Sequence, residues 1–340
     1  MRLDVIVPTY NRSDLLPKTI DSLMRARVPE SHEVFITVVD NNSTDTTYTI
    51  VQSLMLSYGS HLTYLFERKQ GSSHARNAAI SRTQGDLIGF IDDDETIVPE
   101  WYQVVFNAFV DNPDVDFAGG PCLPDWQGIR PPEWLPVEYS AVIGVKDGGA
   151  SEAVFGRDAE AGSLMSGNAV VHRRCVERIG LFNPSLGRIA KGLLSSEDED
   201  FFERLLNAGF KGVYLPEMAI RHLMQESRCT KRYHRRWCFW LGVSDGFRRR
   251  NQNLPGPLWA GLPRWRYRRA FAGILSAACG ALRRDKLGEA FAGELAAWNL
   301  VGLLYGRYFW ESQEPLSKLP ASFSKSNPLE GYSSSNKPAG

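Results

Sequence analysis

The chain has 340 residues, of which 43% are hydrophobic, and its 39 Lys and Arg balance 39 Asp and Glu. This composition excludes an intrinsically disordered protein and allows one large folded domain with an appendage. Five cysteines without a CxxC pair argue against a disulfide framework or a zinc knuckle and indicate a reducing compartment.

The first part of the chain alternates segments typical of strands with segments typical of helices. Strands are predicted at 5–7, 34–39, 62–66 and 87–91, and helices at 48–58 and 73–83. Another helix follows Ser13 or Asp14, either of which could cap it, with Pro17 in its first turn. This alternation predicts a parallel α/β sheet with right-handed connections.

The next part of the chain changes in composition. From about 116 to 162 it is rich in Gly, Pro and Trp, which predicts strands and long loops over an active site rather than a second domain. A helix is predicted at 197–208, closed by Gly209, and a strand at 212–215 ends the predicted sheet. We therefore expect a catalytic α/β domain, a basic aromatic helical extension and a disordered tail, at 1–227, 228–311 and 312–340.

Four consecutive acidic residues, Asp92, Asp93, Asp94 and Glu95, directly follow the predicted strand at 87–91. Open α/β sheets bind ligands at the carboxyl ends of their strands. Carboxylates packed this closely repel one another, so they need a cation to stay ionised together, and oxygen ligands favour Mg²⁺ or Mn²⁺. Taken alone, the segment is explained equally well as a solvated acidic turn or as a helix cap at Asp94.

Two further polar loops follow predicted strands. Asp40 ends the strand at 34–39, where an Asp can accept hydrogen bonds from a ribose or a base edge, although an Asx turn also explains it. Arg76 lies where a loop enters a helix, a place that suits phosphate or base recognition. An exposed Arg in an ordinary capped helix is the simpler interpretation of that stretch by itself.

Acidic residues also open the predicted helix at 197–208, where the helix dipole stabilises them. The run from Glu197 to Asp200 exceeds what capping needs, which makes one of these residues a candidate general base. His222 lies just past a predicted strand, and a lone His is more often a packing or surface residue than a ligand.

In chain order, six segments together resemble the family 2 glycosyltransferases of the GT-A fold. They are VIVPTYNR (5–12), VVDNNSTD (38–45), GSSHARNAAI (71–80), GFIDDDE (89–95), SGNAVVHRR (166–174) and SEDEDFFERLLNAGF (196–210). The resemblance implies an α/β fold with a Rossmann-like, mostly parallel central sheet flanked by helices, followed by a helical C-terminal extension.

The resemblance also implies roles for individual residues. Those expected to bind the nucleotide or its diphosphate are Thr9, Tyr10, Arg12, Asp40, Arg76, Asp92 and Asp93. Asp40 would recognise the base, usually uracil, and Asp92 would face the ribose. Asp94 and His222 would hold Mg²⁺ or Mn²⁺, while Asp198 would deprotonate the acceptor. Gly167 and Asn168 match a segment near the donor sugar and the acceptor.

These roles imply inverting transfer of a sugar from a nucleotide-sugar donor, usually a UDP-sugar, to a hydroxyl of a saccharide or lipid-linked acceptor. Such an enzyme would act in polysaccharide or glycolipid synthesis. The main alternative is a catalytically inactive nucleotide-sugar-binding module. A nucleotidyltransferase is a further alternative, but that class carries a glycine-rich loop after its first strand, and residues 5–15 contain no glycine.

Charge is divided unevenly along the chain. Residues 1–227 hold 20 Lys and Arg against 32 Asp and Glu, whereas 228–340 hold 19 against 7. The arginines and aromatic residues of the second part suggest that a cytoplasmic protein contacts the anionic inner face of the cell membrane. A helical hairpin pairing with the acidic catalytic domain explains them equally well. Nucleic-acid binding is not expected, because no recognition module accompanies the charge.

Overall fold

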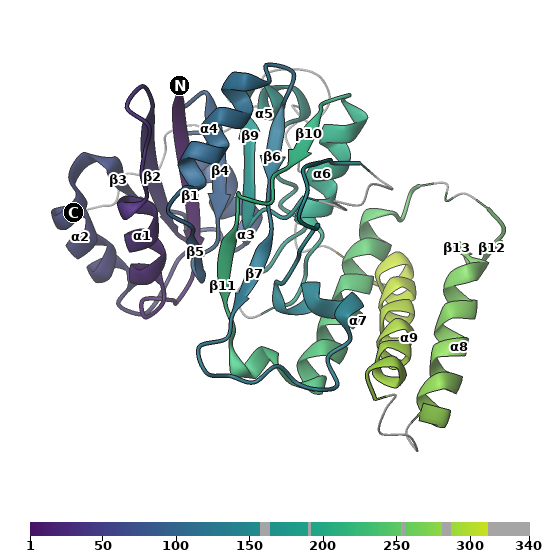
Figure 1. Ribbon diagram of the computed structural model, residues 1–340. Helices are drawn as coiled ribbons and strands as arrows, with labels where there is room; N and C mark the ends of the chain where they lie inside the picture. Colours follow the sequence, from purple (N-terminus) through teal and green to yellow (C-terminus); the bar gives the residue numbers. More distant parts are fainter. Residues whose placement is uncertain (157–163, 190–191, 253, 255, 281–286, 312–340) are drawn as a thin grey trace.

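The computed structural model describes residues 1–156, 164–189, 192–252, 254, 256–280 and 287–311 (Figure 1). The tail expected at 312–340 lies outside these residues. An eight-stranded sheet has the strand order β3-β2-β1-β4-β9-β6-β10-β8. Its strands are β1 (Arg2–Thr9), β2 (Glu33–Asp40), β3 (Leu62–Phe66), β4 (Leu87–Ile91), β6 (Phe117–Gly119), β8 (Ala153–Val154), β9 (Asn168–His172) and β10 (Gly212–Tyr214).

The predicted α/β sheet is confirmed, and it is mostly parallel. Strands β1 to β4 pair with one another in parallel, and β6 and β10 also pair with each other in parallel. β9 runs antiparallel between β4 and β6, and β8 runs antiparallel to β10 at the sheet edge. The segment rich in Gly, Pro and Trp thus supplies strands to the main sheet itself as well as loops.

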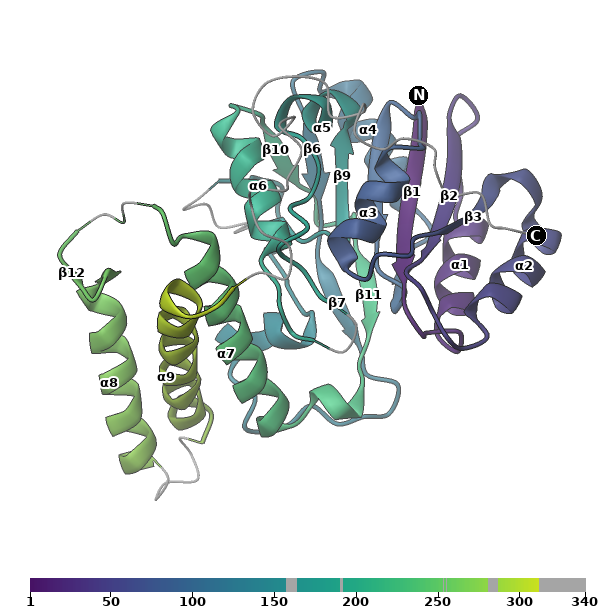
Figure 2. The same ribbon diagram turned by 180° about the vertical axis from the view of Figure 1, so that it is seen from behind.

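Helices cover both faces of this sheet, as Figures 1 and 2 show from opposite sides. They are α1 (Leu16–Arg25), α2 (Thr47–Tyr58), α3 (Ser72–Ile80), α4 (Trp101–Asp111), α5 (Arg173–Ile179) and α6 (Glu197–Asn207). Side chains alternate along β1, so Val5 packs with α1, α2 and α4, whereas Ile6 packs with α3, α5 and α6. The result is two apolar cores, one on each face of a buried sheet.

Two predictions about element ends are wrong. Neither Ser13 nor Asp14 caps α1, which begins after Leu15 without a side-chain cap; the N–H groups of Leu15 and Leu16 instead donate to the Arg12 carbonyl. Pro17 does lie in the first turn. The strand at β10 does not end the sheet region, since β11 (Ile220–Leu223) follows and pairs with β5 (Glu95–Ile97) and β7 (Cys122–Asp125) in a second sheet.

Three long helices form the C-terminal extension: α7 (Lys231–Arg248), α8 (Arg264–Gly280) and α9 (Leu287–Tyr308). A short hairpin of β12 (Leu258–Trp259) and β13 (Leu262–Pro263) precedes α8. The backbones of α7 and α9 touch, because a Cβ on Gly242 would lie 2.2 Å from the carbonyl oxygen of Asn299, and one on Gly302 would lie 2.0 Å from that of Phe239. Within the described residues, no helix is long and apolar enough to cross a membrane.

Helix α7 joins the extension to the α/β part. Cys238 of α7 packs with Phe291 and Leu295 of α9 against Val142 in the 3-10 helix η2 (Val137–Ile143). Arg249, which follows α7, forms a 2.9 Å ion pair with Glu203 of α6. These contacts agree with the alternative in which the helical extension packs on the catalytic domain. Contact between the extension and a membrane stays a prediction.

Candidate active site

The polar segments singled out in the sequence meet at one edge of the main sheet. Strands β1, β2 and β4 are parallel, so their carboxyl ends lie together. Thr9 at the end of β1 is paired with Asp40 at the end of β2, and the acidic run begins directly after β4. This edge is where open α/β sheets place their ligands.

Asp94 is buried and held by positively charged side chains. Its Oδ2 accepts a hydrogen bond from Arg12 Nη1 and another from Arg228 Nη2, both at 3.0 Å. Its Oδ1 lies 3.3 Å from His222 Nε2. Burial alone would favour the protonated acid, but His222, Arg228 and Arg12 hold the pKa of Asp94 well below its ordinary value. Asp94 is therefore a carboxylate already matched by cations.

Asp93 points into the protein instead of toward the open edge of the sheet. Its Oδ2 accepts a 2.7 Å hydrogen bond from the Thr9 hydroxyl, and both side chains are buried. Burial, with a contribution from Asp94, raises the pKa of Asp93 to about 7. Thr9 and Asp93, both expected along the nucleotide, are thus paired with each other beneath the site.

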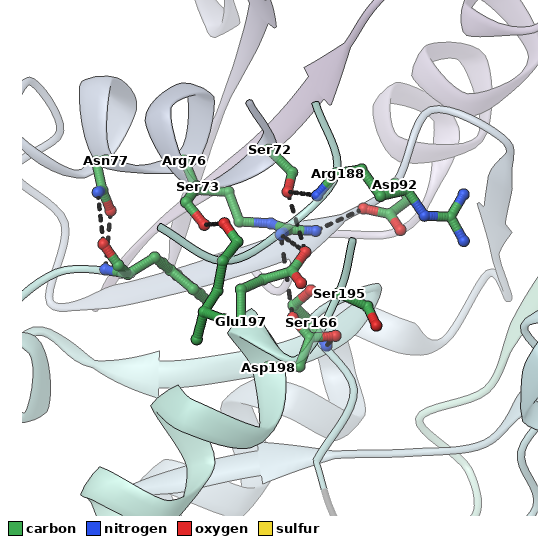
Figure 3. A network of polar contacts seen from close by, with 12 residues as sticks. Ser72, Ser73, Arg76, Asn77, Asp92, Ser166, Arg188, Ser195, Glu197 and Asp198 are labelled. Atoms are coloured by element: carbon green, nitrogen blue, oxygen red, sulfur yellow. Dashed lines mark hydrogen bonds and ion pairs between the residues drawn. The ribbon is translucent and has the colours of Figure 1, made fainter. Parts of the chain in front are cut away.

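Arg76 connects the acidic run after β4 with the acidic start of α6 (Figure 3). Its guanidinium is buried and lies 3.0 Å from Asp92 Oδ1, 3.2 Å from Glu197 Oε1 and 4.0 Å from Asp198 Oδ1. Burial opposes the charge on Arg76, but these three acids raise its pKa above the ordinary value. One cation therefore stands between the predicted nucleotide-binding carboxylate and the predicted base.

Among the acids at the start of α6, Asp198 has a buried carboxylate oxygen without a hydrogen-bond partner in the residues that the structure describes. Its Oδ2 accepts a 3.2 Å hydrogen bond from Ser166 N–H, while Oδ1 is buried and makes no hydrogen bond within the described part of the chain. Burial and the nearby Glu197 raise the pKa of Asp198 to about 6, against the opposing effect of Arg76. A carboxyl with this pKa can exchange a proton near neutral pH.

The other acids of that run have different surroundings. Glu197 accepts a hydrogen bond from Ser72 Oγ as well as from Arg76. Asp200 is paired with Arg204 at 2.9 Å on the same helix. Burial, followed by Asp198, raises the pKa of Glu199 to about 7. Of the four, Asp198 best combines a free oxygen with a position next to Arg76.

The end of β2 builds a second polar corner. Asp40 is buried and accepts hydrogen bonds from Tyr64 OH and Ser43 N–H, both at 2.8 Å. Asn41 holds the loop before α3, because its Oδ1 accepts from Gly71 N–H at 2.7 Å. Tyr10, which directly follows β1, is half-buried at the same edge. Two acceptor positions on the Asp40 carboxylate are left for a ligand.

Residues 167 and 168 contact buried residues next to the site. The side chain of Asn168 is buried and fully used: its Oδ1 accepts from Trp101 Nε1 at 3.0 Å, and its Nδ2 donates to the carbonyls of Pro121 and Met218. A Cβ on Gly167 would lie 2.5 Å from Glu95 Oε1. The Asn168 side chain therefore ties the core together, and the expectation that residues 167–168 lie near the donor sugar and the acceptor stays a prediction.

The residues near Asp94 match the ligand chemistry of a divalent ion only in part. Across the residues that the structure describes, no three His, Cys, Asp or Glu side chains form a complete metal site. Asp94 and His222 would supply one oxygen and one nitrogen ligand, and the buried Nδ1 of His222 has no hydrogen-bond partner among the described residues. Such a mixed set suits Mn²⁺, with further ligands coming from phosphate or water.

Sequence reasoning missed Arg228 and gave no role to Glu95. Arg228 belongs to the basic stretch whose charge suggested contact with a membrane. It donates a hydrogen bond to Asp94, which lies 134 residues earlier in the chain. Its Nη1 also lies 3.0 Å from His222 Nε2. Glu95 Oε2 accepts from Asp92 N–H at 2.8 Å and so shapes the acidic turn. Only the run of four acids hinted at Glu95, and nothing in the spacing pointed to Arg228.

Comparisons with known proteins agree with this architecture. Residues 4–151 match the family model Glycosyl transferase family 2. A glucosyl-dolichyl phosphate glucuronosyltransferase of Haloferax volcanii is 25% identical over 72% of this chain and 76% of its own. The succinoglycan biosynthesis protein ExoM of Rhizobium meliloti is 26% identical over 72% and 74%. The mannosyltransferase PcManGT of Pyrobaculum calidifontis, solved with GDP-Man and Mn²⁺, shares the fold with a TM-score of 0.57 at 17% identity, covering 91% of this chain and 88% of its own.

The mostly parallel sheet, with its acidic run after β4, and these comparisons define a glycosyltransferase of the GT-A fold. The predicted fold and enzyme class are confirmed. Within that class the chain carries the family 2 domain, so the resemblance drawn from the six sequence segments is confirmed as well.

Proposed function

We propose that the protein transfers a sugar, with inversion, from a nucleoside-diphosphate donor to a hydroxyl of a saccharide or lipid-linked acceptor. The observation that carries this proposal is the line of charges Asp92, Arg76 and Asp198 across the edge of the sheet. A leaving group bound at the first and an acceptor bound at the last would lie on either side of the sugar. One base and one leaving-group site fit a single displacement, which inverts the anomeric carbon.

The donor half of the proposal rests on Arg12, Arg76 and Arg228. Their guanidinium groups are now paired with carboxylates, and the phosphoryl groups of a diphosphate also offer pairs of anionic oxygens that a guanidinium binds. Asp94 and His222 would hold a divalent ion that, when bound, neutralises charge on the leaving diphosphate. Asp40 would accept a hydrogen bond from the base, and a UDP-sugar is the first donor to test.

The acceptor half of the proposal rests on Asp198. Its free Oδ1 would take the proton of the acceptor hydroxyl, and the pKa of about 6 leaves it ionised at neutral pH. Arg76 keeps this carboxylate oriented without neutralising it through a close hydrogen bond, since the two groups are 4.0 Å apart. The surrounding core would also exclude water and orient the acceptor.

We also propose that the protein works at the cytoplasmic face of a membrane. The outer side of α8 places Arg264 and Arg268 ahead of the exposed Phe271 and Leu275, spaced four, three and four residues apart. Arginine beside exposed apolar side chains suits anionic headgroups and the interface below them. The name of the Haloferax relative, which specifies a dolichyl phosphate, supports a lipid-linked acceptor.

One experiment tests the reaction class. The full-length protein would be incubated with UDP- and GDP-sugars and Mn²⁺, with and without EDTA, and the products separated by chromatography. We expect metal-dependent release of nucleoside diphosphate and a product of inverted anomeric configuration by NMR. Release of pyrophosphate would show a nucleotidyltransferase, and tight donor binding without any turnover would show a binding module.

A further inference from the structure

A cavity of about 320 Å³ lies outside the site described above, between η2 and the helices α7, α8 and α9. Its size is at the lower end of the range for small-molecule sites. Valine, leucine and alanine side chains form much of its wall. Its larger and charged lining residues include Tyr139, Glu199, Trp237, Trp265, Arg266 and Arg269. An apolar wall with a few charged groups indicates a site for an amphiphile.

Two guanidinium groups give the cavity its anion-binding character. Arg266 is held 3.3 Å from Asp245 Oδ2, which fixes its position on α8. Arg269 is exposed and so keeps donors available for a ligand. Glu138 and Glu199 also line the cavity. Burial, followed by Asp198, raises the pKa of Glu199 to about 7, so it is partly protonated at neutral pH and opposes an anion less.

The cavity borders the catalytic edge of the sheet. Glu199 lies next to Asp198 in the first turn of α6, so one helix terminus faces both the cavity and the candidate base. Ser195 N–H donates to Ser244 Oγ of α7 at 3.0 Å, which fastens that terminus to the cavity wall. Asp198 itself does not line the cavity, but the lining residue Glu199 is its neighbour on α6, so the cavity ends one residue from the candidate base.

We propose that this cavity binds the phosphorylated end of a lipid-linked acceptor. Arg266 and Arg269 contact the phosphate, while Trp237, Trp265 and the aliphatic wall contact the first carbons of the lipid. The sugar carried by that phosphate then extends toward Asp198. This inference rests on the proposed function, because it names the acceptor of the same site.

The binding test uses decyl phosphate, below its micelle concentration, with inorganic phosphate and decanol as separate probes, in calorimetry of the full-length protein. We expect decyl phosphate to bind at least tenfold more tightly than either probe, because only it satisfies both the guanidinium groups and the apolar wall. Arg269→Gln should weaken decyl phosphate binding by about tenfold or more, as expected for loss of a charged hydrogen bond.

Matched controls come from the same helices. Arg268→Gln removes the neighbouring exposed arginine, which does not line the cavity, and should change the affinity by less than about twofold. Trp265→Ala should weaken binding, whereas Trp298→Ala, an exposed tryptophan of α9 outside the cavity, should not.

Several outcomes would overturn the assignment. Equal binding of inorganic phosphate would show an anion site without a lipid, and equal binding of decanol would show an apolar cavity without an anion. Equal losses of decyl phosphate affinity in Arg268→Gln and Arg269→Gln would show that surface charge alone explains the binding. Asp198→Asn should bind decyl phosphate normally. If the wild-type protein bound decyl phosphate but transferred no sugar, the proposed function would fail and this binding site would stand.

Discussion

Replacing Asp198 by Asn tests the chemistry most directly. Asn keeps the shape of the side chain and can still accept a hydrogen bond from Ser166 N–H, but it cannot take a proton. A positioned general base contributes about 10²–10⁴-fold in rate, so we expect kcat to fall by that factor. Donor affinity should stay within a few fold, because Asp198 lies on the acceptor side of Arg76 in the proposed arrangement.

The pH dependence provides a second measurement on the same protein. A base must be ionised to act, so with a pKa of about 6 the wild-type rate should rise from pH 5 to 7 and then level off. The residual rate of Asp198→Asn should lack this rise. The assay is the initial rate of nucleoside diphosphate release with acceptor from pH 5 to 9, beside calorimetric donor binding.

Asp200→Asn is the control, because Asp200 lies on the same helix and is occupied by Arg204. It should keep the wild-type rate within about threefold. A rate above a tenth of wild type in Asp198→Asn, or an unchanged pH profile, would refute the assignment of the base. Glu199, with a pKa of about 7, would then be the residue to replace.

Three further predictions concern stability. Because folding raises the pKa of Asp93 from 3.8 to about 7, the protonated form favours the folded state, and wild-type stability should fall between pH 4 and 7 by up to about 4 kcal/mol. Asp93→Asn should show a smaller fall, which Asp198 and Glu199 with their raised pKa values still cause, and equal Tm losses from pH 5 to 8 in both proteins would contradict the prediction. Asn168→Ala strands the Trp101 N–H and should cost about 2–4 kcal/mol in urea unfolding, whereas an unchanged midpoint would show a relaxed core. Gly302→Ala should lower Tm by several degrees because its Cβ would lie 2.0 Å from the Phe239 carbonyl oxygen. Gly288→Ala should not, because its Cβ would lie 3.9 Å from the Trp134 carbonyl oxygen, an ordinary contact; equal Tm values would contradict the close approach of α7 and α9.

Local patterns in the sequence were sufficient for much of the central sheet. The runs at 62–66 and 87–91 form β3 and β4 with the predicted ends. β4 is buried at every position, as expected of an apolar run covered on both faces, whereas β3 is an edge strand and partly exposed. The start of α1 could not be predicted in this way. The backbone N–H of the candidate cap Ser13 donates a hydrogen bond to Asp45, in a loop 32 residues away that local patterns do not reveal.

The candidate site shows the same division. Strand ends and acidic runs drew attention to Asp40, to Asp92 and its neighbours, and to the start of α6, and the structure brings these groups to one edge of the sheet. The partners of these acids come from distant segments, as when Arg76 meets Glu197 and Asp94 meets Arg228. Local spacing in the sequence does not encode such pairs. For the same reason the sequence could not show that the Asp93 side chain pairs with Thr9.

The position of α7 bears on how the molecule can be divided. Arg228 holds Asp94 just before α7 begins, and Ser244 near its other end fastens the segment that leads into α6. A single rod of 18 residues, about 27 Å long, thus spans from one half of the site to the other. Helix α9 is locked to that rod by backbone contact. Extension and α/β part therefore share one cooperative unit, and a truncation before residue 228 would remove part of the site along with the helices.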